Sequence, residues 1–179
     1  MTPDEELRIA AAKYALDAIP SWELSELARR LVDTRQTPRA VIELATLREP
    51  TMAEAGPLFE RILEARHFTR PSKDEAVWTL LRHYVGVIAD GSVAPRTGLE
   101  PMMGVFGLAE GIGARATQNV GDSHDIQHLV GAYWSYEDLD DAARVVTFKG
   151  ADEKREALDV EVVQRAQEWM KRHGERNQS

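Results

Sequence analysis

The hydrophobic residues of this chain recur at helical spacing from one end to the other. Near the start, positions three or four apart are occupied by Leu7, Ala10, Ala11, Tyr14 and Ala18. Near the end, the same spacing joins Leu158, Val162, Ala166 and Trp169. Such spacing places apolar side chains on one face of an α-helix, and no run shows the strict alternation of a half-buried strand. The pattern predicts an all-α fold.

Polar residues and glycines indicate where these helices begin and end. Thr2, Thr51 and Ser72 are each followed three residues later by a glutamate, which is the spacing of a capping box. Gly91 and Gly174 stand just past two segments of helical spacing and predict helix ends, because glycine readily adopts the backbone conformation that closes a helix. The helices are therefore expected to be joined by short loops.

We expect roughly seven helices in one compact domain that spans residues 1–179. A chain of this length buries a sizeable core without disulfides or metal ions. Residues 98–114 are expected to be helical in their middle, and a further helix is expected from about 123 to 140. The β-branched residues in 143–150 predict a short extended piece, and the last helix is expected at 152–173.

The composition excludes some classes of function and disfavours others. The chain has no cysteine, which excludes disulfides, cysteine-based zinc sites and thiol catalysis. A net charge of −8 disfavours binding to nucleic acid or anionic membranes, because their phosphates repel the chain. The first residues are acidic and lack the apolar run of a secretory signal, and no apolar segment is long enough to span a bilayer. We expect a cytoplasmic protein without a cofactor, and its charge favours a basic protein as partner.

Two histidines lie four positions apart in the segment SHDIQHLVGAYW, residues 123–134. On a helix, that spacing places both side chains on one face, where they can share a metal ion. At about 100° per residue, however, His124 and His128 fall about 160° from Ile126. They lie opposite a predicted buried stripe that comprises Ile126, Leu129, Val130, Tyr133 and Trp134. The count predicts that both histidines face solvent near the start of the helix.

A metal site on that face is the second hypothesis. It uses His124 and His128 as ligands, with Asp122 or Asp125 completing the site or acting as general base of a metal-dependent hydrolase. Such a site needs a further ligand from another segment, because the residues one turn further along the helix cannot ligate. The segment also lacks the glutamate of the His-Glu-x-x-His pattern.

An aromatic and acidic cluster, YWSYEDLDD, ends the same predicted helix. Carboxylates at a helix C-terminus oppose the macrodipole, so stability alone does not explain them. Exposed aromatic rings beside acids are typical of surfaces that dock basic proteins. The predicted partner-binding residues are Trp134, Tyr136, Glu137, Asp138, Asp140 and Asp141. The alternative is that Tyr133 and Trp134 belong to the core and that the acids are only solvated.

Four arginines surround the turn between the second and third predicted helices: Arg29, Arg30, Arg35 and Arg39. This arrangement raises a third hypothesis, a helix-turn-helix regulator that binds DNA. The acidity of the chain disfavours this reading, and the predicted third helix offers a single basic residue to a groove.

Residues 71–95 and 126–141 resemble stretches of small, uncharacterised, all-helical bacterial proteins. The shared features are a capped helix that ends at Asp-Gly and a helix that ends in an aromatic and acidic cluster. The resemblance implies a helical fold and brings no activity with it. Because the chain also lacks a catalytic motif, a non-enzymatic interaction protein ranks first, and an immunity or regulatory partner is its most concrete version.

Overall fold

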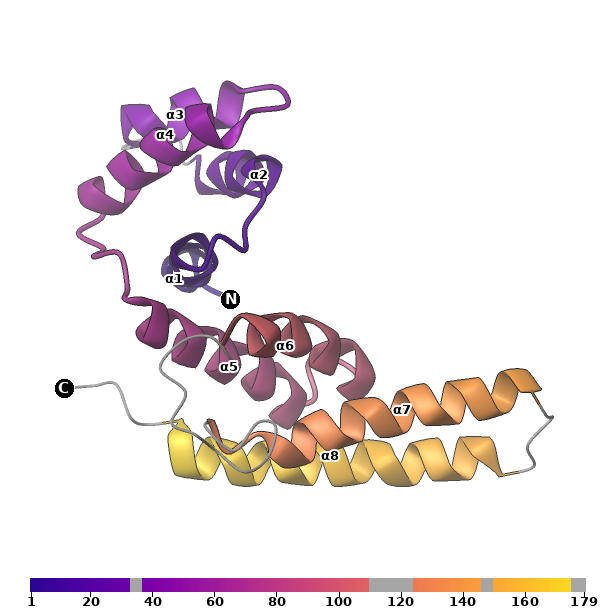
Figure 1. Cartoon of the computed structure of the whole chain (residues 1–179). Helices are drawn as coiled ribbons and strands as arrows, with labels where there is room; N and C mark the ends of the chain where they lie inside the picture. The colour runs from indigo at the N-terminus through magenta and orange to yellow at the C-terminus, as the bar shows by residue number, and fades with distance from the viewer. Residues whose placement is uncertain (33–36, 110–123, 146–149, 175–179) are drawn as a thin grey trace. The chain divides into compact units, whose positions relative to one another are not determined.

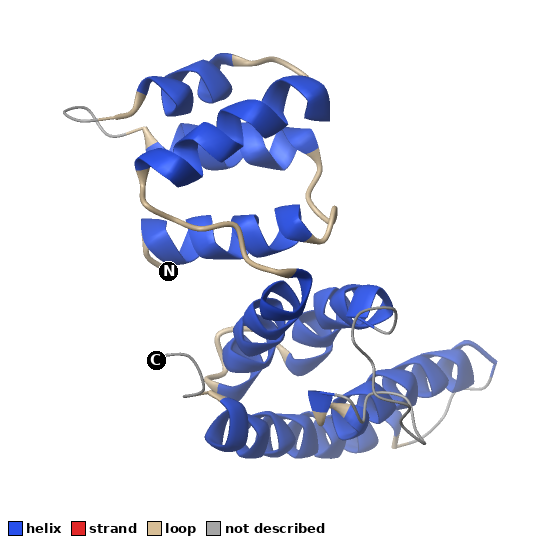
Figure 2. Cartoon of the chain, turned by 60° about the vertical axis from the view of Figure 1, so that its left-hand side comes forward, coloured by secondary structure: helices blue, strands red, loops and turns tan. Residues whose placement is uncertain are grey.

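Every regular element that the structure describes is a helix. The computed structural model describes residues 1–32, 37–109, 124–145 and 150–174. These residues form eight α-helices and no strand (Figures 1 and 2). The all-α prediction is confirmed. Within these ranges, none of the helices combines the length and the apolar character that crossing a membrane requires.

The chain divides into two compact units, Met1–Thr79 and Leu80–Ser179. The boundary falls inside helix α5, Lys73–Ala89, so the backbone that joins the units is helical. A single domain over residues 1–179 stays a prediction.

The first unit surrounds one apolar core. Its helices are α1 (Pro3–Ala15), α2 (Ser21–Leu31), α3 (Arg39–Thr46) and α4 (Met52–Ala65), and the first turns of α5 follow them. The core includes Leu7, Leu24, Val41 and Phe59, one from each of these four helices. Tyr14 packs edge-on against Phe59, with the ring centroids 5.3 Å apart. Gly56 leaves room for the tyrosine, because a Cβ at this position would lie 3.0 Å from the Tyr14 hydroxyl.

The predicted capping boxes begin three of the helices. In α1, α4 and α5, a glutamate of the first turn accepts a hydrogen bond from the backbone N–H of the capping residue. The distances are 2.7 Å for Glu5 and Thr2, 2.9 Å for Glu54 and Thr51, and 2.8 Å for Glu75 and Ser72. These bonds satisfy backbone donors that a helix start leaves unpaired, and hydrogen bonds to the same capping residues lower the pKa of each glutamate.

The second unit contains most of α5 together with α6 (Pro95–Ala109), α7 (Gln127–Val145) and α8 (Ala151–His173). All four helices supply buried residues, among them Leu80, Ile88, Leu99, Val130 and Trp169. Gly98 lets α6 approach α5 closely, because a Cβ at this position would overlap Ile88. Helices α7 and α8 form an antiparallel hairpin, in which Tyr136 contacts Asp159 and Asp140 contacts Arg155 (Figure 1).

Most predicted helix bounds agree with the structure. Helix α8 begins at Ala151 and ends at His173, which agrees with the predicted range 152–173 to within one residue. Helix α6 begins three residues before the expected segment and covers residues 98–109 of it, and the remainder at 110–114 lies outside the described ranges. The predicted extended piece is wrong at 143–145, where the good helix formers Ala143 and Arg144 continue α7 to Val145, and residues 146–149 are not described.

Candidate interaction surface on α7 and α8

The segment before α7 is held by the last turns of α8. The indole N–H of Trp169 donates a hydrogen bond to the backbone carbonyl of His124 at 2.9 Å, and 5% of His124 is exposed. Asp125 adopts a left-handed backbone conformation with φ of 58°, which aspartate tolerates better than most residues. Its carboxylate pairs with Arg172 and lies 3.0 Å from Nε2 of His173. The turn is therefore part of the interior contacts of the second unit.

The prediction that both histidines face solvent is wrong for His124 and confirmed for His128, which is exposed. The difference follows from where the helix starts. Helix α7 begins at Gln127, so His124 precedes it and its angle on a helical wheel says nothing about its direction.

The three described residues of the metal hypothesis, His124, Asp125 and His128, are not brought together as a ligand set. His124 is buried while His128 is exposed, and the carboxylate of Asp125 pairs with residues of α8. Asp122 lies outside the described residues. Across the described ranges, no three histidine, aspartate or glutamate side chains are grouped so that they could hold a metal ion. The geometry therefore gives the hydrolase hypothesis no support.

The buried stripe of α7 is confirmed at Ile126, Leu129 and Val130, all of which are buried. Tyr133 is half-buried, and its ring meets that of Trp134 edge-on at a centroid distance of 5.4 Å. Trp134 itself is 56% exposed. The predicted buried stripe is therefore wrong at Trp134, as is the alternative that placed this residue in the core, and its indole lies on the surface.

Tyr136 lies inside the second unit, with 1% of the residue exposed. Its hydroxyl donates a hydrogen bond to the carboxylate of Asp159 on α8. Burial, and next this hydrogen bond, raise the pKa of the Tyr136 phenol far above its ordinary value. The prediction that Tyr136 belongs to an exposed docking surface is wrong, because α8 covers its side of α7.

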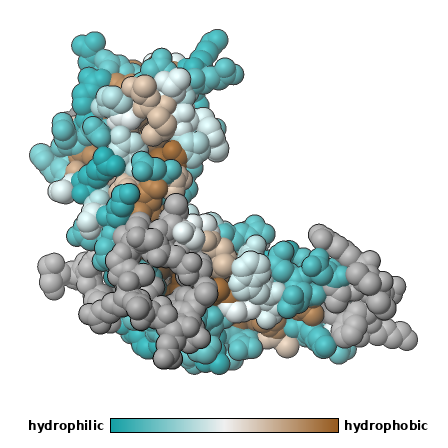
Figure 3. Space-filling view, viewed as in Figure 1, coloured by the Kyte–Doolittle hydropathy of each residue, from teal (hydrophilic) through white to brown (hydrophobic). Residues whose placement is uncertain are grey.

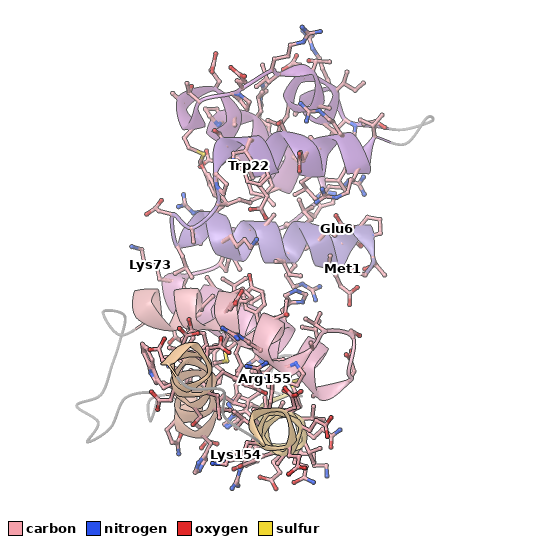
Figure 4. All side chains as sticks on the ribbon, turned by 90° about the vertical axis from the view of Figure 1, so that its right-hand side faces the viewer. Met1, Glu6, Trp22, Lys73, Lys154 and Arg155 are labelled. Atoms are coloured by element: carbon pink, nitrogen blue, oxygen red, sulfur yellow. The ribbon has the colours of Figure 1, made fainter. Side chains whose placement is uncertain are left out.

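Among the predicted acidic contact residues, Glu137 and Asp140 pair with arginines. Asp140 pairs with Arg96 at the start of α6 and with Arg155 on α8, the latter at 2.5 Å. Glu137 accepts a hydrogen bond from Arg96 at 3.2 Å. The hydrogen bond to Asp140 raises the pKa of Arg96. Figure 4 shows Arg155 on the side of α8 toward the other helices of the unit and its neighbour Lys154 on the far side. These charges join three helices to one another.

The remaining predicted contact residues share the solvent-facing side of α7. Trp134, Asp138 and Asp141 are all exposed. On a helical wheel Asp138 lies about 40° and Asp141 about 20° from Trp134, so carboxylates follow the indole one and two turns further along the helix. On the face seen in Figure 3, hydrophilic residues cover much of the α7–α8 hairpin. We name Trp134, Asp138 and Asp141 the α7 stripe.

The position of the acids within the helix differs from the prediction. Helix α7 continues to Val145 instead of ending at Asp140. The acids therefore lie in its middle, where the macrodipole has little effect, and the opposing dipole no longer argues for their function. Their exposure beside Trp134 is the observation that remains.

The arginines of the first unit are engaged within that unit. Arg29 donates to carbonyl groups at the end of α3 at 3.1 and 3.0 Å, as a basic side chain at a helix C-terminus commonly does. Arg30 and Arg39 pair with carboxylates on α1 and α3. Arg35 lies outside the described residues. These contacts serve the fold and do not support a helix-turn-helix regulator.

Sequence reasoning missed Arg155 and Asp159, which face Asp140 and Tyr136 across the hairpin. The signal that could have found them is a pair of polar residues four positions apart on each helix. The pairs are Tyr136 and Asp140 on α7, and Arg155 and Asp159 on α8. Because residues four apart share a helix face, two such pairs can bond in register between antiparallel neighbours.

Comparison of the chain with protein families, with curated proteins and with solved structures finds no match. The likeness of residues 71–95 and 126–141 to small bacterial proteins therefore extends only to the helical fold.

Proposed function

We propose that this protein is a non-enzymatic interaction protein that binds a basic protein through the α7 stripe. The observation that carries the proposal is the 56% exposed Trp134 beside the exposed carboxylate of Asp138. An indole offers a large apolar contact area at a small cost in conformational entropy, and nearby carboxylates attract and orient lysine and arginine.

The residues around the stripe are suited to holding it in one conformation. Tyr136 anchors α7 to α8 from inside, and Glu137 and Asp140 tie it to the arginines of α6 and α8. A surface that is already ordered loses less entropy when a partner binds, which favours affinity. In this proposal Trp134, Asp138 and Asp141 contact the partner, while the other three predicted residues support them.

An immunity or regulatory partner is the most concrete version of the proposal. Such a protein controls a basic protein in the cytoplasm by covering part of its surface. The net charge of −8 supports this version, because an acidic chain attracts a basic partner over a distance and speeds association.

The test is affinity purification of the tagged full chain from its native host, with quantification of the recovered partner. We expect Trp134→Ala and Asp138→Lys each to weaken the complex about tenfold or more. The matched control for the indole is Trp22→Ala, since Trp22 on α2 is also 56% exposed (Figure 4). The control for the charge is Glu64→Lys, at an exposed position of α4. Equal recovery with all four variants would contradict the proposal.

A further inference from the structure

Helix α8 repeats the surface pattern of α7. Val160 is 59% exposed, and the exposed residues Glu156 and Glu153 lie one and two turns before it. Their angular offsets from Val160, about 40° and 20°, equal those of the α7 stripe. Among the described side chains of the second unit, Trp134 and Val160 are the large hydrophobic ones that are exposed. We name Val160, Glu156 and Glu153 the α8 stripe.

The two stripes run in the same direction along the hairpin. Because α7 and α8 are antiparallel and Tyr136 contacts Asp159, Trp134 and Val160 lie at nearly the same height. In each stripe, the acids then follow toward the end of the hairpin where residues 146–149 connect the helices. Both helices thus present an apolar side chain first and carboxylates beyond it.

The exposed stripes contribute little to the core. Residues 152–161 of α8 include no buried side chain, whereas the rest of the helix buries Val162, Ala166 and Trp169. Polar contacts with α7, those of Asp159 and Arg155, hold this part of α8 in place. The carboxylates of Glu153 and Glu156 and the side chain of Val160 are therefore available to another molecule.

The charge of this part of the chain selects the chemistry of that molecule. Residues 135–161 contain nine aspartates and glutamates and four lysines and arginines, a net charge of −5 out of the −8 of the whole chain. Such a local excess attracts a positively charged partner and repels an acidic one. Trp134 and Val160, exposed at the same height, add apolar contact area that a folded partner can use and that small counterions cannot.

We propose that both stripes bind the same partner, and that this partner receives residues 134–141 of α7 and 152–161 of α8 in a cleft lined with lysine and arginine side chains. Apolar positions on the walls of the cleft face Trp134 and Val160. The inference rests on the proposed function and deepens it, because a flat basic surface that touches α7 alone would leave the α8 stripe without a role.

Photochemical cross-linking of the full chain in its native host tests the cleft. A photoreactive phenylalanine analogue replaces Ser135 in one variant and Ala157 in another, since both positions are exposed neighbours of the stripes. We expect the same protein to be captured from both positions, through peptides rich in lysine and arginine. The matched control places the analogue at the exposed Lys171, about 16 Å from Val160 along α8, and is expected to capture none of it.

Charge reversal completes the experiment. Combined Glu153→Lys and Glu156→Lys changes on α8 are expected to lower capture from position 135 on α7 about tenfold, whereas Glu64→Lys leaves it unchanged. Circular dichroism verifies that each variant remains helical. Capture from position 135 together with none, or a different protein, from position 157 overturns the cleft and leaves the proposed function standing. Capture from neither position overturns both, and cross-linked peptides without basic residues overturn the assigned chemistry.

Discussion

The inner and outer halves of the α7–α8 hairpin are built differently. The inner half, residues 126–130 and 162–173, buries Ile126, Leu129, Val130, Val162, Ala166 and Trp169. In the outer half, Tyr136 is the buried residue among the described side chains of 134–141 and 152–161, and ion pairs supply much of the contact. Fully burying a large apolar side chain stabilises a fold by about 1.5–3 kcal/mol, but a half-exposed ion pair by about 1 kcal/mol or less. The inner half therefore supplies most of the stability of the unit, and the outer half contributes less.

The largest change in stability is expected for Trp169→Ala in the inner half. The change removes a fully buried indole and its hydrogen bond to the His124 carbonyl. We expect the free energy of unfolding, measured by urea denaturation, to fall by about 3–5 kcal/mol. The control is Trp134→Ala in the outer half, which is expected to change it by less than about 0.5 kcal/mol. Similar losses for the two variants would show that the halves do not differ as described.

A smaller effect is expected from Asp140→Ala, which removes the acid shared by Arg96 and Arg155. Since these side chains are partly exposed, we expect a loss of about 1–2 kcal/mol at low salt, shrinking as ionic strength rises. Asp138→Ala serves as control, because Asp138 is exposed on the opposite side of α7. A loss independent of salt would mean that packing rather than charge joins the helices at this point.

The smallest effect at neutral pH is expected from Tyr136→Phe. The ring remains buried and only the hydrogen bond to Asp159 is lost, so unfolding should become easier by about 1 kcal/mol. The partner-binding affinity should change little, because the hydroxyl does not reach the surface. A loss of binding without a loss of stability would indicate that Tyr136 contacts the partner.

The same tyrosine gives a pH dependence with a definite sign. Its pKa is raised in the fold above the ordinary value of 10.0, so the unfolded chain releases this proton at lower pH than the folded chain. The contribution of Tyr136 to stability is complete below that value and is lost as pH rises beyond it. Denaturation between about pH 9 and about pH 11 should therefore show a steeper loss for the wild type than for Tyr136→Phe. Tyr133→Phe, at a half-buried position, should retain the steep loss.

The sequence predicted the helices well because their signals are local. Capping boxes marked the starts of α1, α4 and α5, and apolar spacing placed α8 to within one residue. The faces of α7 were harder to predict. At about 100° per residue, Trp134 lies about 80° from Ile126 on one side of the helix, and Tyr136 lies about 80° from it on the other. The position of the apolar stripe therefore does not tell which of the two rings a neighbouring helix covers.

Tertiary contacts decide that question. The bond between Tyr136 and Asp159 shows that α8 covers the Tyr136 side and leaves Trp134 exposed. His124 was misplaced for a related reason, because the left-handed Asp125 delays the start of α7 and the turn packs against α8. Both errors depend on a neighbour distant in sequence, which periodicity within one helix cannot reveal.

Hydrogen exchange along α8 of the full chain tests the difference between the two halves most directly. Amides of residues 152–158 should exchange faster, through local opening, while those of 163–170, beside the buried Val162, Ala166 and Trp169, should exchange only with unfolding of the unit. Mass spectrometry of peptides from each half separates the two rates. Uniform protection along the whole helix would contradict the claim that the inner half maintains the fold while the outer half contributes little to it.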